Sequence, residues 1–311
     1  MRNKILAGLL LAAMWFAMPC DGQVQMVYDD AAPLFKYPEV PEKLTKVNMR
    51  SNFMVEHLWD DCNLEKEDIT NIASFRETFN DYISFFILAD LNVVEKSIDK
   101  FIDRVSKNEK NLATVIGFTN TELFSPSAQY WSDDVYAIFA KALIGNKRVD
   151  KNVKAELQRN VRIIDNSRKG LVMGDIPLVE AAGKAASLHG LKSECTILFF
   201  NVDGCVDCSI YKLRLSTDVV TNRLINAGVV SVVSVYPEGA DAASKMASDP
   251  ETWRKAIVPD LYDTYDFRIV PCVYVLDKDK RIVDKNPEIT QLLLLMARVG
   301  SVTAGSGDGN K

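Results

Sequence analysis

Two cysteines separated by two residues have the types and spacing for chemistry in this sequence of 311 residues. They form the segment Cys205-Val206-Asp207-Cys208. Such a pair can form a disulfide, or it can supply half of the four ligands of a zinc ion. The sequence has no second Cys-x-x-Cys and only 2 histidines to complete a zinc site. We therefore predict a disulfide, either redox-active or purely structural, with no metal and no other cofactor.

The position of this pair in the chain favours redox chemistry over a structural disulfide. It follows the apolar, β-rich run 195–201 and a short loop, and a helix is predicted to open at Cys205. The N-terminus of a helix has unpaired N–H groups and about half a positive charge, which stabilise a thiolate. We predict that Cys205 is the exposed nucleophile. Cys208, one turn later and more buried, is predicted to resolve the mixed disulfide with a partner protein.

Asp207 lies between the cysteines and places a negative charge within one helical turn of both sulfurs. By electrostatics alone, this charge raises the thiol pKa values and opposes the helix dipole. We therefore predict a site that reduces its partners or reacts slowly, rather than a strong oxidant.

The elements around the pair are predicted to form a parallel strand–helix–strand unit followed by a hairpin. The first helix is expected to have one apolar face, which is shared by Ile210, Leu213, Val220 and Leu224. The expected order is a strand at 195–201, a helix from 205 to 226, a strand at 229–236, a short helix at 249–253, hairpin strands at 270–277 and 280–284, and a closing helix at 289–297.

A proline that leads a later strand, Pro271, completes a pattern that resembles the thioredoxin family. The resemblance covers about 171–299. It is closest to exported thioredoxin-like proteins with Phe-Phe-x-x-x-x-Cys-x-x-Cys, here 199–208, and Tyr-x-x-Arg-x-x-Pro-x-x-Tyr-x-Leu-Asp, here 265–277. The resemblance implies that Pro271 is a cis-proline beside the disulfide. It also implies that the backbone of Val270 pairs with an extended substrate segment by β-augmentation.

Three departures from thioredoxin surround the pair. Gly204 replaces the aromatic residue that often precedes the first cysteine, and Val206-Asp207 replaces Gly-Pro. Phe199 stands where thioredoxin has a buried acid, so the usual route for proton transfer to the resolving cysteine is missing. Glu194 lies too early in the sequence to replace that acid.

The chain before the resemblance shows helical periodicity, with apolar residues on one face over 94–105, 135–143 and 153–164. It is similar to the uncharacterised helical domain that often precedes such modules, which brings no known activity. We predict an α+β protein of two domains, an all-α helical bundle followed by a thioredoxin-like α/β/α sandwich. The predicted boundaries are 23–168 for the bundle, 169–300 for the sandwich and 301–311 for a disordered tail.

The first 22 residues have the pattern of a signal peptide. Arg2 and Lys4 precede an apolar run over 5–17, which is shorter than the about 20 residues that span a bilayer. We expect cleavage near residue 22 and export to the periplasm or cell envelope, where disulfides form readily. The alternatives are a retained membrane anchor and a lipid anchor on Cys20, although the residues before Cys20 match a lipoprotein signal poorly.

The remaining cysteines and the histidines have alternative interpretations. Cys272 follows the predicted cis-proline and is either an accessory thiol near the disulfide or, as we predict, a small buried side chain. Cys195 is predicted to be a core residue, and His189 a loop residue with a satisfied hydrogen bond. His57 lies near Asp60, where we expect a capped helix end rather than a metal site.

Two functions of different classes are consistent with these patterns. The first is an envelope thiol-disulfide oxidoreductase that acts on protein thiols or disulfides and is recharged by a membrane-bound reductase. The second is a partner-binding or scaffold protein whose thioredoxin-like part has lost efficient chemistry. The net charge of −5 leaves no basic excess, so nucleic acid is not an expected partner. Membrane contact is expected only through the lipid anchor.

Overall fold

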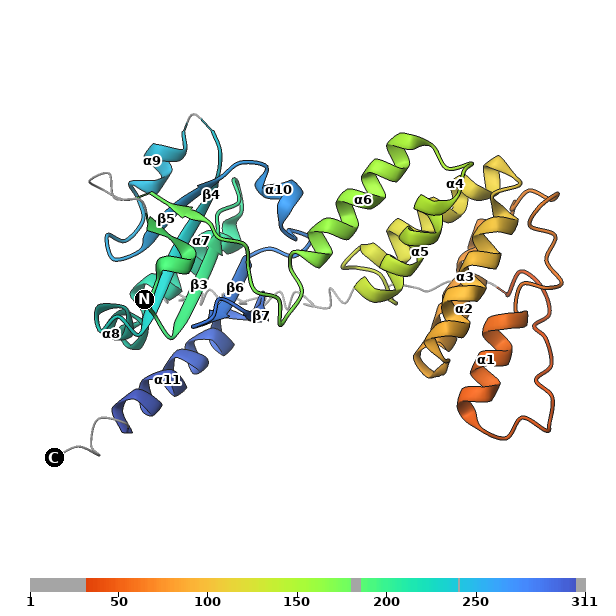
Figure 1. The fold of residues 1–311 in the computed structure, drawn as a ribbon, viewed down its shortest axis with the longest axis horizontal. Coiled ribbons are helices and arrows are strands. Elements are labelled where there is room, and N and C mark those ends of the chain that lie inside the picture. The colour runs from red at the N-terminus through yellow and green to blue at the C-terminus, as the bar shows by residue number, and fades with distance from the viewer. Residues whose placement is uncertain (1–31, 180–185, 240, 306–311) are drawn as a thin grey trace, which may run out of the picture.

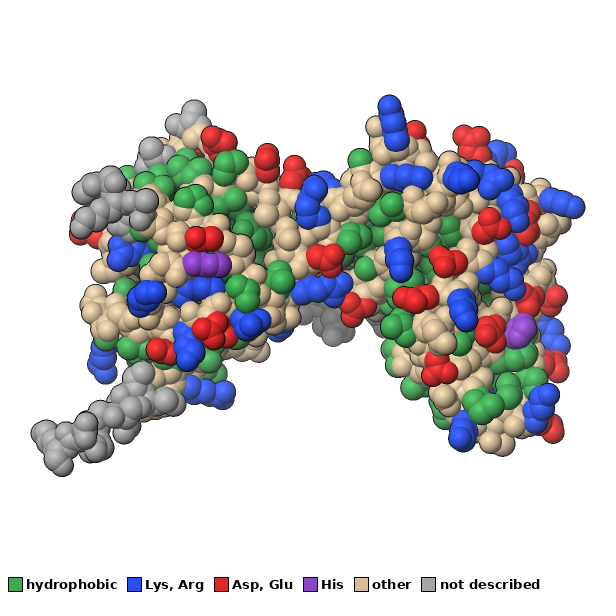
Figure 2. Space-filling model, viewed as in Figure 1, with side chains coloured by type: hydrophobic (Ala, Val, Ile, Leu, Met, Phe, Trp, Pro, Cys, Tyr) green, Lys and Arg blue, Asp and Glu red, His purple; other side chains and the backbone are tan. Residues whose placement is uncertain are grey.

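The computed structural model describes residues 32–179, 186–239 and 241–305, and Figure 1 shows their arrangement. The predicted signal peptide, with Cys20, lies outside the described residues. Within the described ranges, no helix combines the length and the apolar character that crossing a membrane requires. Figure 2 shows basic and acidic side chains interspersed over the visible face, in keeping with the small net charge.

The first part of the described chain is helical (Figure 1). Its helices pack around one apolar core. Its α-helices are α1 Val47–His57, α2 Ile72–Ser84, α3 Leu91–Val105, α4 Glu109–Phe118, α5 Asp133–Gly145 and α6 Lys151–Asp165. The 3-10 helix η1 spans Phe85–Leu88 and the π-helix η2 spans Thr119–Phe124. The three segments with helical periodicity are thus α3, α5 and α6. Aromatic rings fill the centre of this core, where Trp59 contacts Phe75, Tyr82 and Phe101.

Within the described residues, a mixed sheet of seven strands follows, with the spatial order β2-β1-β5-β4-β3-β6-β7. The strands are β1 Pro177–Leu178, β2 Ala186–Ser187, β3 Cys195–Phe200, β4 Val230–Pro237, β5 Arg254–Val258, β6 Cys272–Asp277 and β7 Ile282–Lys285. β3 pairs with β4 in parallel, as the strand–helix–strand order predicts, and β6 pairs with β7 as the predicted hairpin. The antiparallel partner of β3 on its other edge is β6.

Both faces of the central strands are buried, which explains the continuous apolar run of β3. Ile197 and Phe199 face α7 Val206–Thr217, α8 Val219–Asn226 and α11 Ile289–Gly305. Leu198 and Phe200 face the opposite layer, which includes the short helices η3 Leu188–Gly190 and α10 Leu261–Thr264. The remaining helix, α9 Ala242–Met246, follows β4. All six residues of β3 are consequently buried.

The predicted helix from 205 to 226 is two helices, because Asp218 ends α7 and caps α8. The Asp218 carboxylate accepts a hydrogen bond from the backbone N–H of Thr221 at 2.8 Å, a common N-cap arrangement. The predicted apolar face was wrong for Ile210 and Leu213, which are 52% and 62% exposed, whereas Leu224 on α8 is buried. The residues that α7 buries are Cys208, Tyr211 and Leu215.

Two further expectations differ from the structure. Residues 249–253 form a turn closed by Trp253 N–H and Pro250 O at 3.0 Å, not a helix, and the turn leads directly into β5. The closing helix α11 continues beyond the predicted end at Ala297 to Gly305, so it includes the first residues of the predicted tail. The rest of that tail, 306–311, lies outside the described residues.

Candidate redox site at the start of helix α7

Cys205 and Cys208 form a disulfide at the start of α7, with an S–S distance of 2.10 Å. Cys205 is the N-cap of the helix, and its Sγ accepts a hydrogen bond from the backbone N–H of Cys208 at 3.1 Å. Cys205 is partly exposed, whereas Cys208 is only 4% exposed. In the reduced state, this geometry lets the helix N-terminus stabilise a thiolate on the accessible sulfur. The arrangement suits Cys205 for attack and Cys208 for resolution.

The loop before Cys205 turns at Gly204, whose φ of +72° lies in the left-handed region. A residue with a Cβ atom is less stable there by about 1–2 kcal/mol. The glycine that departs from the family pattern therefore has a conformational reason. It lets the chain turn from the end of β3 into the first turn of α7.

Asp207 is exposed in the first turn of α7. A carboxylate at this position stabilises the helix N-terminus but disfavours a thiolate on the neighbouring cysteines. Because the side chain is in solvent, counter-ions screen its effect on the sulfurs. The preference of the site for reducing its partners therefore stays a prediction.

The peptide bond between Val270 and Pro271 is cis, and β6 begins at the next residue. Cys272 pairs with Phe200, the last residue of β3, so Pro271 lies at the sheet end from which the chain runs to Cys205. Val270 is 45% exposed and makes no backbone hydrogen bond within the described part of the chain. Its backbone is therefore accessible to an extended partner strand.

Cys272 is not brought together with the disulfide. Its side chain belongs to the apolar cluster on one face of the sheet, whereas Cys208 belongs to the cluster on the other face. Cys272 is fully buried, and its Sγ donates to the carbonyl of Asp266 at 3.4 Å. Burial raises the pKa of this thiol far above its ordinary value. The geometry fits the buried side chain rather than the accessory thiol.

The other predicted residues occupy structural positions. Cys195 is buried at the start of β3, and burial raises its pKa to about 11. His189 is held by a hydrogen bond between its Nε2 and the carbonyl of Met173 at 2.7 Å. At the end of α1, His57 Nδ1 lies 2.7 Å from the carboxylate of Asp60. These contacts match the structural interpretations of the two histidines and of Cys195.

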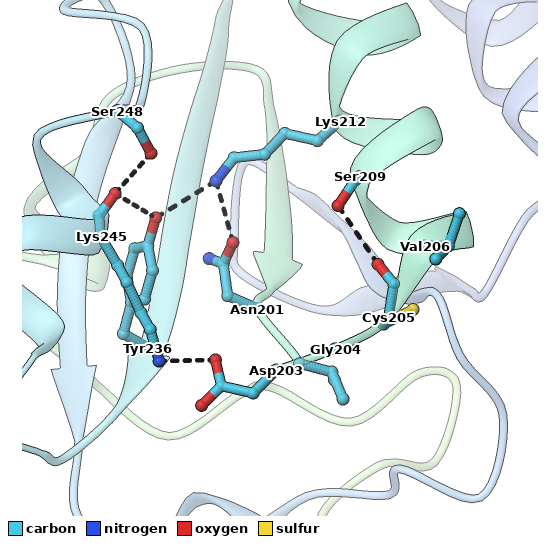
Figure 3. Close-up of a pocket in the computed structure, with 11 residues that line it drawn as sticks. Asn201, Asp203, Gly204, Cys205, Val206, Ser209, Lys212, Tyr236, Lys245 and Ser248 are labelled. Atoms are coloured by element: carbon cyan, nitrogen blue, oxygen red, sulfur yellow. Dashed lines mark hydrogen bonds and ion pairs between the residues drawn. The ribbon is translucent and has the colours of Figure 1, made fainter.

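A pocket of about 390 Å³ adjoins Cys205 and contains a lysine that the sequence analysis missed (Figure 3). Lys212 lies on α7 and forms an ion pair with the fully buried carboxylate of Asp249. Its Nζ also donates to Asn201 Oδ1 at 2.9 Å and to the Tyr236 hydroxyl at 3.2 Å, and Tyr236 donates to Asp249 Oδ2 at 2.8 Å. A buried ion pair is therefore built beside the candidate site, from α7, β4 and the turn at 249–253.

The sequence did contain a pattern that could have placed Lys212 at the site. Lys212 follows Cys205 by two helical turns and Ser209 by one, so the three share a face of α7 and all line the pocket. Asp249 had no such signal, because it was expected only to begin a short helix at 249–253. The second lysine at the pocket, Lys245, pairs with Asp203 and Asp241, each at 2.7 Å.

One family model matches the N-terminal part of the chain. Residues 21–167 match a family model described as a domain of unknown function, DUF5106. Among curated proteins, none matches this chain.

Solved structures are also similar to this chain. A crystal structure of a thioredoxin-like protein from Bacteroides caccae superposes with a TM-score of 0.63 at 21% identity, covering 86% of this chain and 99% of that chain. A thiol:disulfide interchange protein from Bacteroides sp. matches with a TM-score of 0.36 at 20% identity, covering 43% of this chain and 90% of that chain. The thioredoxin domain of a thiol-disulfide oxidoreductase from Bacteroides vulgatus has the same score and identity, covering 42% of this chain and 96% of that chain. The similarity to the Bacteroides caccae structure shows that this chain has a thioredoxin-like fold.

Proposed function

We propose that this protein is a thiol-disulfide oxidoreductase that acts on protein thiols or disulfides through Cys205 and Cys208. The observation that carries the proposal is the position of Cys205, partly exposed at the N-cap of α7 with the Cys208 N–H directed at its sulfur. A structural disulfide has no need of an accessible sulfur at a helix N-terminus. The cis-proline at the same end of the sheet adds support.

The reaction in the reducing direction has two exchange steps. The Cys205 thiolate attacks one sulfur of the partner disulfide, a mixed disulfide forms, and the other partner sulfur leaves as a thiolate. The Cys208 thiolate then attacks Cys205 Sγ, which closes the Cys205–Cys208 disulfide and releases the second partner sulfur. Two electrons have passed to the partner, and a dithiol reductase, which we place in the membrane, must return the site to its reduced state.

The strand edge at Val270 would hold the partner during these steps. Backbone hydrogen bonds from an extended segment to Val270 depend little on side chains, so the site would accept partners of varied sequence. The polar lining of the neighbouring pocket is compatible with a polypeptide rather than a compact apolar ligand.

We further propose two domains, a helical domain over 23–168 and a thioredoxin-like domain over 169–300. The apolar cores support this division, because the cluster of the helices ends at Ile164 and those of the sheet begin at Met173. We also propose export to the periplasm or cell envelope, with residues 1–22 as signal peptide and Cys20 lipidation as the alternative. The N-terminus of the mature protein, read by mass spectrometry from an envelope fraction, distinguishes these two forms.

Insulin reduction with dithiothreitol as electron donor tests the function. The wild-type chain should accelerate precipitation of the insulin B chain, and Cys205→Ser should not. Cys208→Ser should accumulate a mixed disulfide with envelope proteins, because the resolving thiol is gone. If wild type and Cys205→Ser are equally inactive and the Cys208→Ser variant traps no partner, the scaffold function replaces this proposal.

A further inference from the structure

The segment that leads into the cis-proline is held by side chains from the helical part. Arg159 on α6 pairs with Asp263, and its Nη2 donates to the carbonyl of Tyr262 at 3.0 Å. Asn166 donates to the carbonyl of Thr264 at 3.1 Å. Three residues in succession, 262–264, are thus fixed by α6 and the residue that follows it.

Arg268 makes the most extensive of these contacts, only two residues before Val270. Its guanidinium donates from Nη2 to Asp133, the first residue of α5, at 2.7 Å, and from Nη1 to the carbonyl of Phe124 at 3.0 Å. It also lies 4.3 Å from the centre of the Phe124 ring and 5.3 Å from that of Trp131. The side chain is 8% exposed. Such a buried guanidinium is stable only while all of these partners stay in place.

On the sheet side, the same guanidinium is held by Asp266. Nε and Nη2 donate to the two carboxylate oxygens at 2.9 and 2.8 Å, and Lys285 of β7 donates to one of them at 2.8 Å. The carbonyl of Asp266 accepts from the thiol of Cys272. Asp266 is therefore bonded to residues on both sides of Pro271, and Arg268 connects this loop to the helices.

Arg268 thus connects the helical part of the molecule to the loop that precedes Pro271. Arg268 is anchored to the start of α5 and the end of η2, and Val270 is two residues further along the chain. Because consecutive Cα atoms are about 3.8 Å apart, the Cα atom of Val270 lies within about 7.6 Å of that of Arg268. The helical part is thus in direct contact with the loop that carries Val270.

We propose that Arg268 is a positioning residue through which the helical part holds the Val270–Pro271 segment in the conformation that binds an extended polypeptide. The benefit of this role to catalysis rests on the proposed function. The contacts between the helical part and this segment do not depend on it. This positioning gives the helical part a role in the redox site, which it would not have if the two parts of the chain acted independently. Arg268 acts through Val270 and does not touch the sulfurs in the proposed reaction.

The experiment uses the full mature chain with Asp133→Asn, Arg268→Lys and Arg268→Gln. Asp134→Asn is the matched control, because Asp134 is the next residue, is 81% exposed at its side chain and pairs with Arg168 instead. Each variant is assayed by hydrogen exchange over 267–274, by insulin reduction, and by reduction of the small disulfide 5,5′-dithiobis(2-nitrobenzoate), which needs no strand edge.

We expect faster exchange at 267–274 and an about tenfold higher KM for insulin in Asp133→Asn, which loses the negative charge of the ion pair, and in Arg268→Gln, which loses the guanidinium. The rate with the small disulfide should change less than about twofold, as should every value of the control. Arg268→Lys keeps the charge without the two-pronged donor and should fall between wild type and Arg268→Gln.

Unchanged exchange over 267–274 together with an unchanged KM in the folded Asp133→Asn and Arg268→Lys variants would overturn the positioning role, even if Arg268→Gln does not fold. The exchange measurement also separates this inference from the proposed function. If the wild-type chain reduces neither insulin nor the small disulfide, the oxidoreductase proposal fails, and faster exchange in the variants still establishes the link.

Discussion

Cys208 and Cys272 project toward opposite faces of the same sheet. β6 begins beside the end of β3, so Cys272 is close to the candidate site along the strand direction. The alternation of side chains along a strand nevertheless turns Val273, and not Cys272, toward the layer of α7. Its thiol cannot exchange with the Cys205–Cys208 disulfide unless β6 leaves the sheet.

Thiol labelling should separate the cysteines of the reduced protein. We expect iodoacetamide at pH 7 to modify Cys205 within minutes, because its sulfur is accessible and lies at a helix N-terminus. Cys208, Cys195 and Cys272 are buried and should react only after unfolding. Peptide mapping by mass spectrometry measures this order. Labelling of Cys272 as fast as that of Cys205 would contradict the assignment of its side chain to the far face.

Replacing Asp207 by Asn should make the site more oxidising. The change removes a negative charge from the first turn of α7, so the thiolate on Cys205 becomes easier to form. Because Asp207 is exposed, we expect only an about threefold faster alkylation of Cys205 at pH 7 and a reduction potential less negative by on the order of 10 mV. Equilibration with glutathione buffers measures the potential. A shift toward more negative values would show that Asp207 acts through something other than its charge.

Elements that depend on local sequence patterns, such as β3 and the hairpin of β6 and β7, could be predicted from the sequence. The run 195–201 is apolar at every position because both faces of β3 are covered, and this pattern is independent of distant residues. The hairpin of β6 and β7 is likewise bounded by its own turn residues at 277–280. Cys205 at the helix start follows from the same local reasoning.

Features that depend on distant partners could not be predicted. Asp218 restarts the helix, and this break shifts the phase of the apolar face, so Ile210 and Leu213 point to solvent. The pairing of β5 with β4 and the ion pair between Lys212 and Asp249 join segments far apart in the sequence. A short strand that starts Arg-Lys and a carboxylate before a proline gave no local sign of burial.

The ion pair between Lys212 and Asp249 should contribute to stability mainly as a unit. Lys212→Met leaves the carboxylate of Asp249 fully buried without its cation, and such a loss destabilises a protein by about 3–5 kcal/mol. Lys212 is 21% exposed, so we expect the lower end of that range. Adding Asp249→Asn removes the unpaired charge and keeps the acceptor for Tyr236, and should recover about half of the loss.

Urea denaturation of the wild type, the two single variants and the double variant measures this coupling. The prediction requires the double variant to be more stable than Lys212→Met. A double variant that loses the sum of the two single effects would show that the two side chains act independently.

Asp266 should make the protein sensitive to acid. Although burial alone would raise it, hydrogen bonds from Arg268 and Lys285 lower the pKa of Asp266 to about 2, from 3.8. Since the carboxylate binds a proton less readily in the folded state, its contribution to stability is complete above about pH 5. It is lost as the pH falls toward 2, and amounts to roughly 2 kcal/mol.

The free energy of unfolding of Asp266→Asn, measured in urea between pH 7 and pH 2.5, isolates this contribution from that of the other carboxylates. At pH 7 the variant should be less stable than wild type, because Arg268 and Lys285 lose their common anion. The difference should shrink as the pH falls, since protonation of Asp266 makes the wild type resemble the variant. The exposed Asp134→Asn serves as control and should run parallel to wild type. If the Asp266→Asn curve also stays parallel to wild type down to pH 2.5, ionisation of the Asp266 carboxylate does not contribute to stability, and its proposed ion pair with Arg268 is contradicted.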